Sequence, residues 1–305
     1  MSDRRPPESP VVSPDVRLPY SKGLMAKALM GTGLTPERSY ELARLIESEL
    51  VREHEDAAAS LEHVYDVAAR VLADHEDEDA VRRLRRFQAL QDVDLPLIVL
   101  VGGATGTGKS TITTEVAHRL GITRVTSTDF VRQTMRAVFS EAFMPSIHFS
   151  SFEAGRALKP AERESEDALI AGFLEQTRNV LVGVRAVVDR ALTEAHSMAL
   201  EGVHVVPGLV PASLEGAIVS QCVIAIPDEE EHARHFFVRD ADSEGLRPVE
   251  KYLDALPEIR RLQDFVVERA HEAGVPVIEN AGREQAVDAV LRLVLDAVER
   301  VRVPA

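Results

Sequence analysis

Residues 95–112, LPLIVLVGGATGTGKSTI, contain the pattern that decides the fold. An unbroken apolar run ends at Gly102, and the residues from Gly103 to Ser110 follow the spacing G-x-x-x-x-G-K-S. The residues after them, TITTEVAHRL, carry apolar side chains at helical period. A strand, a glycine-rich loop and a helix in this order are the context of a Walker A motif. The stretch therefore predicts a nucleotide-binding P-loop, and the alternative is a chance glycine-rich turn after a core strand.

The residue types of this loop suit the binding of a phosphate chain. Glycine adopts backbone conformations that a side chain forbids, so successive N–H groups can converge on phosphate oxygens. The helix that follows adds free N–H groups and the positive end of its dipole. We expect Lys109 to reach the terminal phosphates and the Ser110 hydroxyl to ligate Mg²⁺. The residues predicted to bind ATP are Gly103, Ala104, Thr105, Gly106, Thr107, Gly108, Lys109, Ser110 and Thr111.

The composition limits the partners of this chain. Among 305 residues there are 35 Lys and Arg against 50 Asp and Glu, a formal net charge of -15. Nucleic-acid surfaces rely on clustered positive charge, so we expect no nucleic-acid partner, and an anionic substrate would need local arginines. The single cysteine excludes an intrachain disulfide and fits a reducing compartment. No apolar run has the length of a membrane span, so a cytoplasmic protein is expected.

The chain divides into three regions by composition and period. Residues 1–15 are proline-rich and polar and are expected to form a disordered leader. Residues 16–92 carry helical patterns, with Thr35 and Pro36 as a helix start. From 93 to 305, strands alternate with helices, which predicts an α/β fold with a parallel sheet and helices on both faces. The expected strands are 97–102, 124–127, 198–206, 222–226 and 275–278, with Cys222 as a buried strand residue.

Chemically capable side chains follow the predicted strands, where parallel sheets bind ligands. Asp129 follows the second strand, with Arg132 on the next helix, and could orient an acceptor hydroxyl; the alternative is a helix N-cap. Glu201 ends the third apolar run and could hold a metal-bound water; the alternative is a buried salt bridge. His204 alternates with valines, and a histidine on a strand face is most often structural.

Three further segments belong to this prediction. The charged segment 227–248 carries Arg234 and Arg239 and is either a lid that closes over phosphates or an exposed helical arm. PSIHFSSFEAGRALKP, residues 145–160, is expected to be an insertion on the substrate side. ENAGREQAV, after the last strand, is the expected place of the adenine contacts.

Taken together, these motifs resemble the 2-phosphoglycerate kinases known chiefly from archaea. The resemblance covers nearly all of residues 16–290 and rests on VRLPYSKGLMAKALMGTGL, GGATGTGKST, STDFVRQTMR, HFSSFEAG, EGVHVVPG, HARHFFVR and EKYLDALPEIRRLQDFVVERA. It implies an N-terminal ATP-cone-like domain over 16–92 joined to a P-loop kinase domain over 93–305. ATP-cone domains usually begin with a strand carrying a basic-acidic-glycine stretch, which SPDVRLPYSKG lacks. Packing against the kinase domain and formation of a homo-oligomer are therefore alternative roles for this region.

The same resemblance implies a phosphotransferase with an alcohol group as acceptor. The phosphoryl group of ATP would pass to the 3-hydroxyl of 2-phosphoglycerate, giving 2,3-bisphosphoglycerate and ADP. In this interpretation Lys109 and Ser110 hold the phosphates and magnesium, Asp129 orients the hydroxyl and Glu201 supports the metal. The arginines implied to bind the carboxylate and phosphate of the substrate are Arg132, Arg190, Arg234 and Arg239. The alternatives are a kinase of another small hydroxy acid or phosphosugar, and a non-catalytic ATP-sensing regulatory protein.

Overall fold

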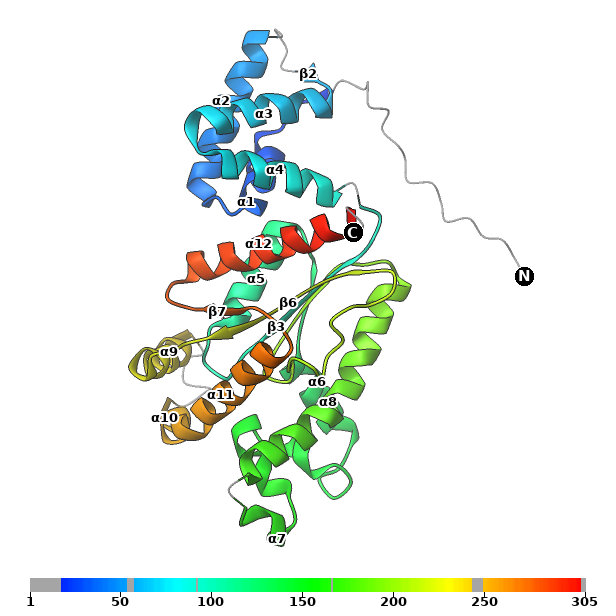
Figure 1. Cartoon of the computed structure of the whole chain (residues 1–305), viewed down its shortest axis with the longest axis vertical. Helices are drawn as coiled ribbons and strands as arrows, with labels where there is room; N and C mark the ends of the chain where they lie inside the picture. Colours follow the sequence, from blue (N-terminus) through cyan, green and yellow to red (C-terminus); the bar gives the residue numbers. More distant parts are fainter. Residues whose placement is uncertain (1–17, 54–57, 92, 166, 243–248, 303–305) are drawn as a thin grey trace, which may run out of the picture. The chain divides into compact units, whose positions relative to one another are not determined.

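The computed structural model of the chain describes residues 18–53, 58–91, 93–165, 167–242 and 249–302 (Figure 1). The predicted leader, residues 1–15, lies outside these ranges. The chain divides into two compact units, Met1–Gln88 and Ala89–Ala305, and each is described by itself. No helix within the described ranges has both the length and the apolar character needed to cross a membrane.

The first unit is built from helices that bury their apolar faces against one another. Its helices are α1 (Lys22–Gly31), α2 (Pro36–Glu53), α3 (Leu61–His75) and most of α4 (Glu78–Gln91), and their interior side chains include Leu29, Leu42, Ile46, Leu50 and Leu72. The predicted start of α2 is confirmed, because the Thr35 hydroxyl accepts a hydrogen bond from the Arg38 N–H at 3.3 Å. A short antiparallel ladder, β1 (Leu18–Pro19) with β2 (Ala58–Ala59), was not expected from the helical pattern.

The second unit contains the predicted parallel sheet. Its strand order is β4-β5-β3-β6-β7, and every neighbouring pair is parallel. The strands are β3 (Leu97–Gly102), β4 (Arg124–Ser127), β5 (Met198–Glu201), β6 (Ile218–Ala225) and β7 (Val277–Glu279). All residues of β3 are buried. A central strand covered on both faces has no solvent side, which explains its unbroken apolar sequence.

Helices cover both faces of this sheet, as predicted (Figure 1). On one face, Val99 and Val101 pack with α5 (Lys109–Leu120) and α12 (Arg283–Arg302). On the other, Ile98 and Leu100 pack with α6 (Thr128–Val138) and α8 (Ala168–Thr193), and Val223 packs with α11 (Leu256–Glu272). The remaining helical segments are η1 (Pro145–His148), η2 (Ser151–Ala157), α7 (Pro160–Arg163), α9 (Glu229–Asp242) and α10 (Val249–Asp254).

Several strand boundaries differ from the sequence expectation, including those of the last strand, which runs from Val277 to Glu279 and not over 275–278. The third strand of the prediction was drawn to residue 206, but β5 ends at Glu201 because Gly202, at φ +148°, turns the chain out of the sheet. The strand around Cys222 begins at Ile218, earlier than predicted. Cys222 is buried as expected, and burial raises the pKa of its thiol to about 12.

Candidate active site at the carboxyl edge of the sheet

The strand register brings the chemically capable residues to one edge. Ser127 and Val101 each lie beside Glu201 in the ladder, so β3, β4 and β5 end together. A cleft of about 590 Å³ opens there. It is lined by Gly106, Gly108, Lys109, Ser110, Thr111, Ile112, Ser127, Asp129, Glu201, Gly202, Glu231, His235, Asn280, Ala281, Gly282 and Arg283. Residues from the predicted P-loop, the predicted acceptor side and the predicted adenine segment therefore share one cleft.

The P-loop adopts a backbone conformation that only glycine takes readily. Gly103, Gly106 and Gly108 have φ angles of +144°, +88° and +81°. A Cβ atom at Gly106 would come within 2.5 Å of the Phe236 ring. Gly108 is the N-cap of α5, so the helix begins at Lys109 with its N-terminus at the loop. This is the geometry in which free N–H groups and a helix dipole attract phosphate.

Side chains outside the loop hold its carbonyl groups. His232 Nε2 lies 2.8 Å from the Thr105 carbonyl oxygen, and His235 Nδ1 lies 3.1 Å from that of Gly106. Asn280 Nδ2 donates to the Thr107 carbonyl oxygen at 3.0 Å. Because a carbonyl oxygen can only accept, each ring nitrogen named here must carry its proton. Asn280 belongs to the predicted adenine segment, and His232 and His235 belong to the HARHFFVR motif, but their contacts with the loop were not predicted, since nothing in their spacing relates them to it.

Lys109, Ser110 and Glu201 line the cleft together. Lys109 Nζ donates to the Ala104 carbonyl oxygen at 3.2 Å. The Ser110 hydroxyl donates to Glu201 Oε1 at 3.0 Å, and Glu201 is 7% exposed. The partner of Glu201 is thus the Ser110 hydroxyl. No ion pair of Glu201 occurs among the described residues, which counts against the alternative that Glu201 forms a buried salt bridge.

The second oxygen of the Glu201 carboxylate is a candidate ligand for a cation. Glu201 Oε2 is buried and has no hydrogen-bond partner among the described residues. A buried polar atom without a partner is costly, and carboxylate and hydroxyl oxygens are ligands that Mg²⁺ accepts. No group of three or more His, Cys, Asp or Glu side chains in the described ranges could hold a metal ion by itself. Ser110 and Glu201 therefore have the oxygen donors that would suit a magnesium ion.

Asp129 lines the same cleft and lies in the first turn of α6. The N-cap of this helix is Ser127, whose hydroxyl accepts from the Phe130 N–H at 3.0 Å, so the N-cap alternative for Asp129 is wrong. The Asp129 side chain is 62% exposed, and Arg132 Nε lies 3.4 Å from its Oδ1. Burial opposes its ionisation, but interactions with its basic neighbours, among them Arg132 and Lys109, outweigh that effect and hold the pKa of the Asp129 carboxyl below its usual range.

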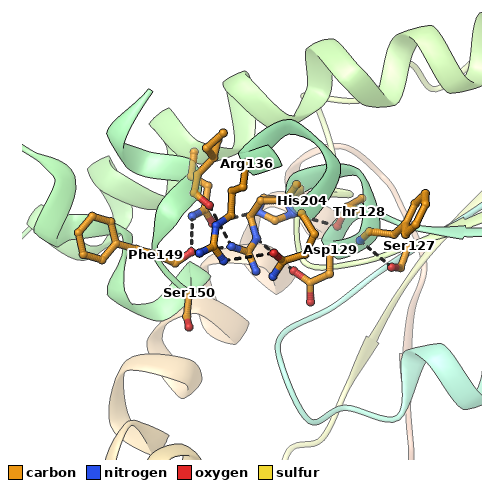
Figure 2. Close-up of polar contacts among 12 residues, drawn as sticks. Ser127, Thr128, Asp129, Arg136, Phe149, Ser150 and His204 are labelled. Atoms are coloured by element: carbon orange, nitrogen blue, oxygen red, sulfur yellow. Dashed lines mark hydrogen bonds and ion pairs between the residues drawn. The ribbon is translucent and has the colours of Figure 1, made fainter. Parts of the chain in front are cut away.

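A buried polar network lies behind Asp129 (Figure 2). The His204 ring is within hydrogen-bond distance of Thr128 on one side and Gln176 on the other. Burial lowers the pKa of His204 to about 3, so the ring is neutral, and only Arg132 and Lys109 act on Asp129 as positive charges at neutral pH. His204 lies beyond the end of β5, so its predicted place on a strand face is wrong.

The structure brings the predicted substrate arginines together only in part. Arg132 lies beside Asp129. Arg190 lies in the last turn of α8 and pairs with Glu194. Glu194 also binds Arg124 at the start of β4, so Arg190 lies at the edge opposite the cleft. Arg234, on α9, is 64% exposed and pairs with glutamates of its own helix. The side chain of Arg239 lies outside the part of the chain that the structure describes.

Comparison with known proteins identifies relatives of this chain. No family model matches the chain. A 2-phosphoglycerate kinase from Methanopyrus kandleri is 38% identical over 92% of this chain and 85% of its own length. A 2-phosphoglycerate kinase from Thermococcus kodakarensis is 35% identical over 94% of this chain and 97% of its own length. Among solved structures, shikimate kinase from Acinetobacter baumannii with bound shikimate is 22% identical, with a TM-score of 0.38 over 68% of this chain and 97% of that one.

Proposed function

Because this chain belongs to the 2-phosphoglycerate kinase family, we propose that it transfers the terminal phosphoryl group of ATP to the 3-hydroxyl of 2-phosphoglycerate, giving 2,3-bisphosphoglycerate and ADP. The observation that carries the proposal is the hydrogen bond between Ser110 and Glu201, with the second Glu201 oxygen buried and without a partner in the described part of the chain. It lies in the same cleft as Lys109 and Asp129. Phosphoryl transfer requires a metal ion, a phosphate cradle and an oriented acceptor, and these residues supply a place for each.

The nucleotide side of the reaction depends on the P-loop. The loop N–H groups and the N-terminus of α5 bind the phosphates. Lys109 leaves the Ala104 carbonyl oxygen and binds the terminal phosphates. Ser110 and Glu201 would hold Mg²⁺, which would neutralise charge on the phosphate oxygens. Asn280 and the residues after it, Ala281 to Arg283, form the wall of the cleft where the adenine binds.

The acceptor side depends on Asp129. The acceptor oxygen forms a bond to the terminal phosphorus, and the bond from that phosphorus to the bridging oxygen of ADP breaks. The hydroxyl proton passes to the Asp129 carboxylate, which is ionised at neutral pH. Arg132 keeps this carboxylate charged and in place. Arg234 and Arg239 stay predicted contacts for the carboxylate and phosphate of the acceptor. Arg190 lies at the opposite edge of the sheet and therefore does not contact the acceptor.

The test is magnesium-dependent release of ADP from ATP with 2-phosphoglycerate, 3-phosphoglycerate, glycerate or no acceptor. Phosphorus NMR identifies the product. We expect release with 2-phosphoglycerate and a bisphosphorylated product, and loss of turnover in Lys109→Ala. Asp129→Asn should lower kcat by about 10²- to 10⁴-fold, the usual contribution of a general base, with ATP binding retained.

Other outcomes would select the alternatives. Release of ADP with a different hydroxy acid or a phosphosugar would keep the kinase chemistry and overturn the proposed acceptor. Binding of ATP without any acceptor-dependent release would favour a regulatory protein. Full activity in Lys109→Ala would contradict the mechanism itself. An ATP-cone-like role for residues 16–92 and a cytoplasmic location stay predictions from the sequence.

A further inference from the structure

A chain of buried hydrogen bonds joins the start of α6 to segment 145–150, which contains η1. His204 is fully buried, with Nδ1 2.9 Å from Thr128 Oγ1 and Nε2 2.9 Å from Gln176 Oε1. The Gln176 amide nitrogen donates to the carbonyl oxygens of Ser146 at 2.6 Å and Phe149 at 3.0 Å. Gln176 is itself fully buried on α8. This series of hydrogen bonds therefore runs through the protein interior, where an unpaired polar group is costly.

The two carbonyl acceptors determine the direction of every bond in this chain. Because a carbonyl oxygen can only accept, the amide nitrogen of Gln176 must face Ser146 and Phe149. Its oxygen then faces the His204 ring and accepts, so Nε2 of the ring carries the proton. Nδ1 is left as an acceptor for the Thr128 hydroxyl. One tautomer of a neutral imidazole satisfies all partners.

Arg132 holds the same segment from the acceptor side. Its Nη1 donates to the carbonyl oxygens of Ile147 and Phe149, at 3.0 Å each, while its Nε faces Asp129 at 3.4 Å. The Phe149 oxygen thus accepts from both Arg132 and Gln176. Figure 2 shows the polar contacts among these segments, with Phe149, Thr128, Asp129 and His204 labelled. Segment 145–150 and Asp129 are therefore tied to each other by two routes.

We propose that His204 and Gln176 are positioning residues, which hold segment 145–150 in register with Asp129 so that the acceptor hydroxyl is aligned with the phosphoryl group. Neither side chain lines the cleft, so each acts through the segment that it holds. The kinetic consequences rest on the proposed kinase function, but the hydrogen-bond arrangement can be tested without it. If the two residues have a merely structural role, their variants should lose stability alone, and the kinetic parameters for the acceptor and for ATP should stay unaffected or change equally.

Two amide variants separate the two sides of the imidazole. The amide of His204→Asn lies near the Nδ1 position and loses the bond to Gln176, whereas the amide of His204→Gln reaches the Nε2 position and keeps a donor there. We expect His204→Asn to lower kcat/KM for the acceptor by about tenfold, as loss of a buried hydrogen bond predicts, with the KM for ATP unchanged. His204→Gln should restore most of that loss.

A matched control lies one position along α8. Thr177 is fully buried and its hydroxyl has no partner among the described residues. Gln176→Leu should lower kcat/KM for the acceptor by at least as much as His204→Asn, whereas Thr177→Val should leave both KM values unchanged. Equal effects of Gln176→Leu and Thr177→Val would overturn the proposal, as would unchanged acceptor kinetics in both His204→Asn and Gln176→Leu.

Two measurements on the full chain need no substrate. Amide hydrogen exchange should accelerate over 145–150 in Gln176→Leu and stay unchanged over 103–110, whereas Thr177→Val should match the wild type in both. Nitrogen-15 NMR of the imidazoles should show His204 protonated at Nε2 alone at neutral pH. Exchange over 145–150 that does not accelerate, or a His204 ring protonated at Nδ1, would overturn the proposal. If the wild type phosphorylates no acceptor, the proposed function fails, while exchange and NMR still decide this inference.

Discussion

The Ser110 hydroxyl lies 3.0 Å from Glu201 Oε1, a contact between residues 91 positions apart in the chain. Ser110 belongs to the first turn of α5 and Glu201 ends β5, so the contact joins the phosphate loop to the neighbouring strand. It leaves the second carboxylate oxygen buried and available. The magnesium dependence of the reaction should therefore depend on the charge of this one side chain.

Glu201→Gln tests that dependence. Glutamine keeps an oxygen that can accept from Ser110 but removes the negative charge. We expect the Mg²⁺ concentration for half-maximal activity to rise about 10- to 100-fold, the usual effect of weakening a metal site. A titration of Mg²⁺ at fixed ATP in the ADP-release assay measures this. Glu215→Gln, at an exposed residue before β6, is the control, and identical titrations for the two variants would contradict the assignment of Glu201.

Gly106→Ala tests the shape of the phosphate loop. Alanine at this position combines a strained φ of +88° with a contact to the Phe236 ring at 2.5 Å. Gly216 has a similar φ of +75° with no atom within 4 Å of a Cβ, so Gly216→Ala carries the strain alone. We expect each of the two alanine variants to lower the free energy of unfolding by about 1–3 kcal/mol. Gly106→Ala should lose more stability than Gly216→Ala, and only Gly106→Ala should lose ATP binding. Calorimetry with and without ATP measures both effects, and equal behaviour of the variants would show that the ring contact has no role.

The stability of the protein should depend on pH through His204. Burial lowers the pKa of this ring from 6.5 to about 3 in the folded state, with Arg132 and Lys109 acting in the same direction and Asp129 opposing them. The unfolded chain binds a proton below pH 6.5 that the folded state does not bind until about pH 3. The contribution is therefore complete above pH 6.5 and is lost on acidification, at about 1.4 kcal/mol per pH unit.

His204→Asn should remove this dependence. Chemical denaturation of wild type and variant at pH 7, 6 and 5 should show the wild-type advantage shrinking as the pH falls. The lowered pKa of Asp129 acts in a different range, because its contribution is present above the ordinary pKa of an aspartate and is lost only as the pH falls through the lower folded value. A constant difference between wild type and variant across these pH values would contradict the neutral assignment of the ring.

Asn280 should affect ATP without affecting the acceptor. Its amide donates to the Thr107 carbonyl oxygen, and it lines the nucleotide side of the cleft. Asn280→Ala removes the bond, and Asn280→Asp places a negative charge beside a carbonyl oxygen and near the phosphates. We expect KM for ATP to rise about tenfold in the alanine variant and further in the aspartate variant, with KM for the acceptor unchanged. Steady-state kinetics with each substrate varied in turn checks this, and a rise in both KM values would show a general loss of structure instead.

The sheet and the phosphate loop were predictable because their signals are local. The apolar run before Gly103, the glycine spacing and the helical period after Ser110 all lie within one short stretch. The positions of Asp129 and Glu201 followed from a general property of parallel sheets, since residues after the strands meet at one edge. The structure confirms that both line the same cleft as the loop.

The features that sequence reasoning missed depend on contacts between distant segments. Gln176 meets His204 because α8 packs on the sheet, and no spacing in the sequence indicates that pairing. Arg190 was expected at the cleft, but α8 has 26 residues and carries its last turns to the opposite edge. A helix of this length spans about 39 Å, so a residue near its end cannot serve a site at its beginning.

Cys222 gives this chain a built-in reporter of its own unfolding. It is the single cysteine of the protein, it is 2% exposed in β6, and β6 pairs with the central strand β3. A thiol whose pKa is raised to about 12 has almost no reactive thiolate at neutral pH. Alkylating reagents can therefore modify Cys222 only when the sheet opens. The rate of labelling then measures how often the sheet opens, without any introduced probe.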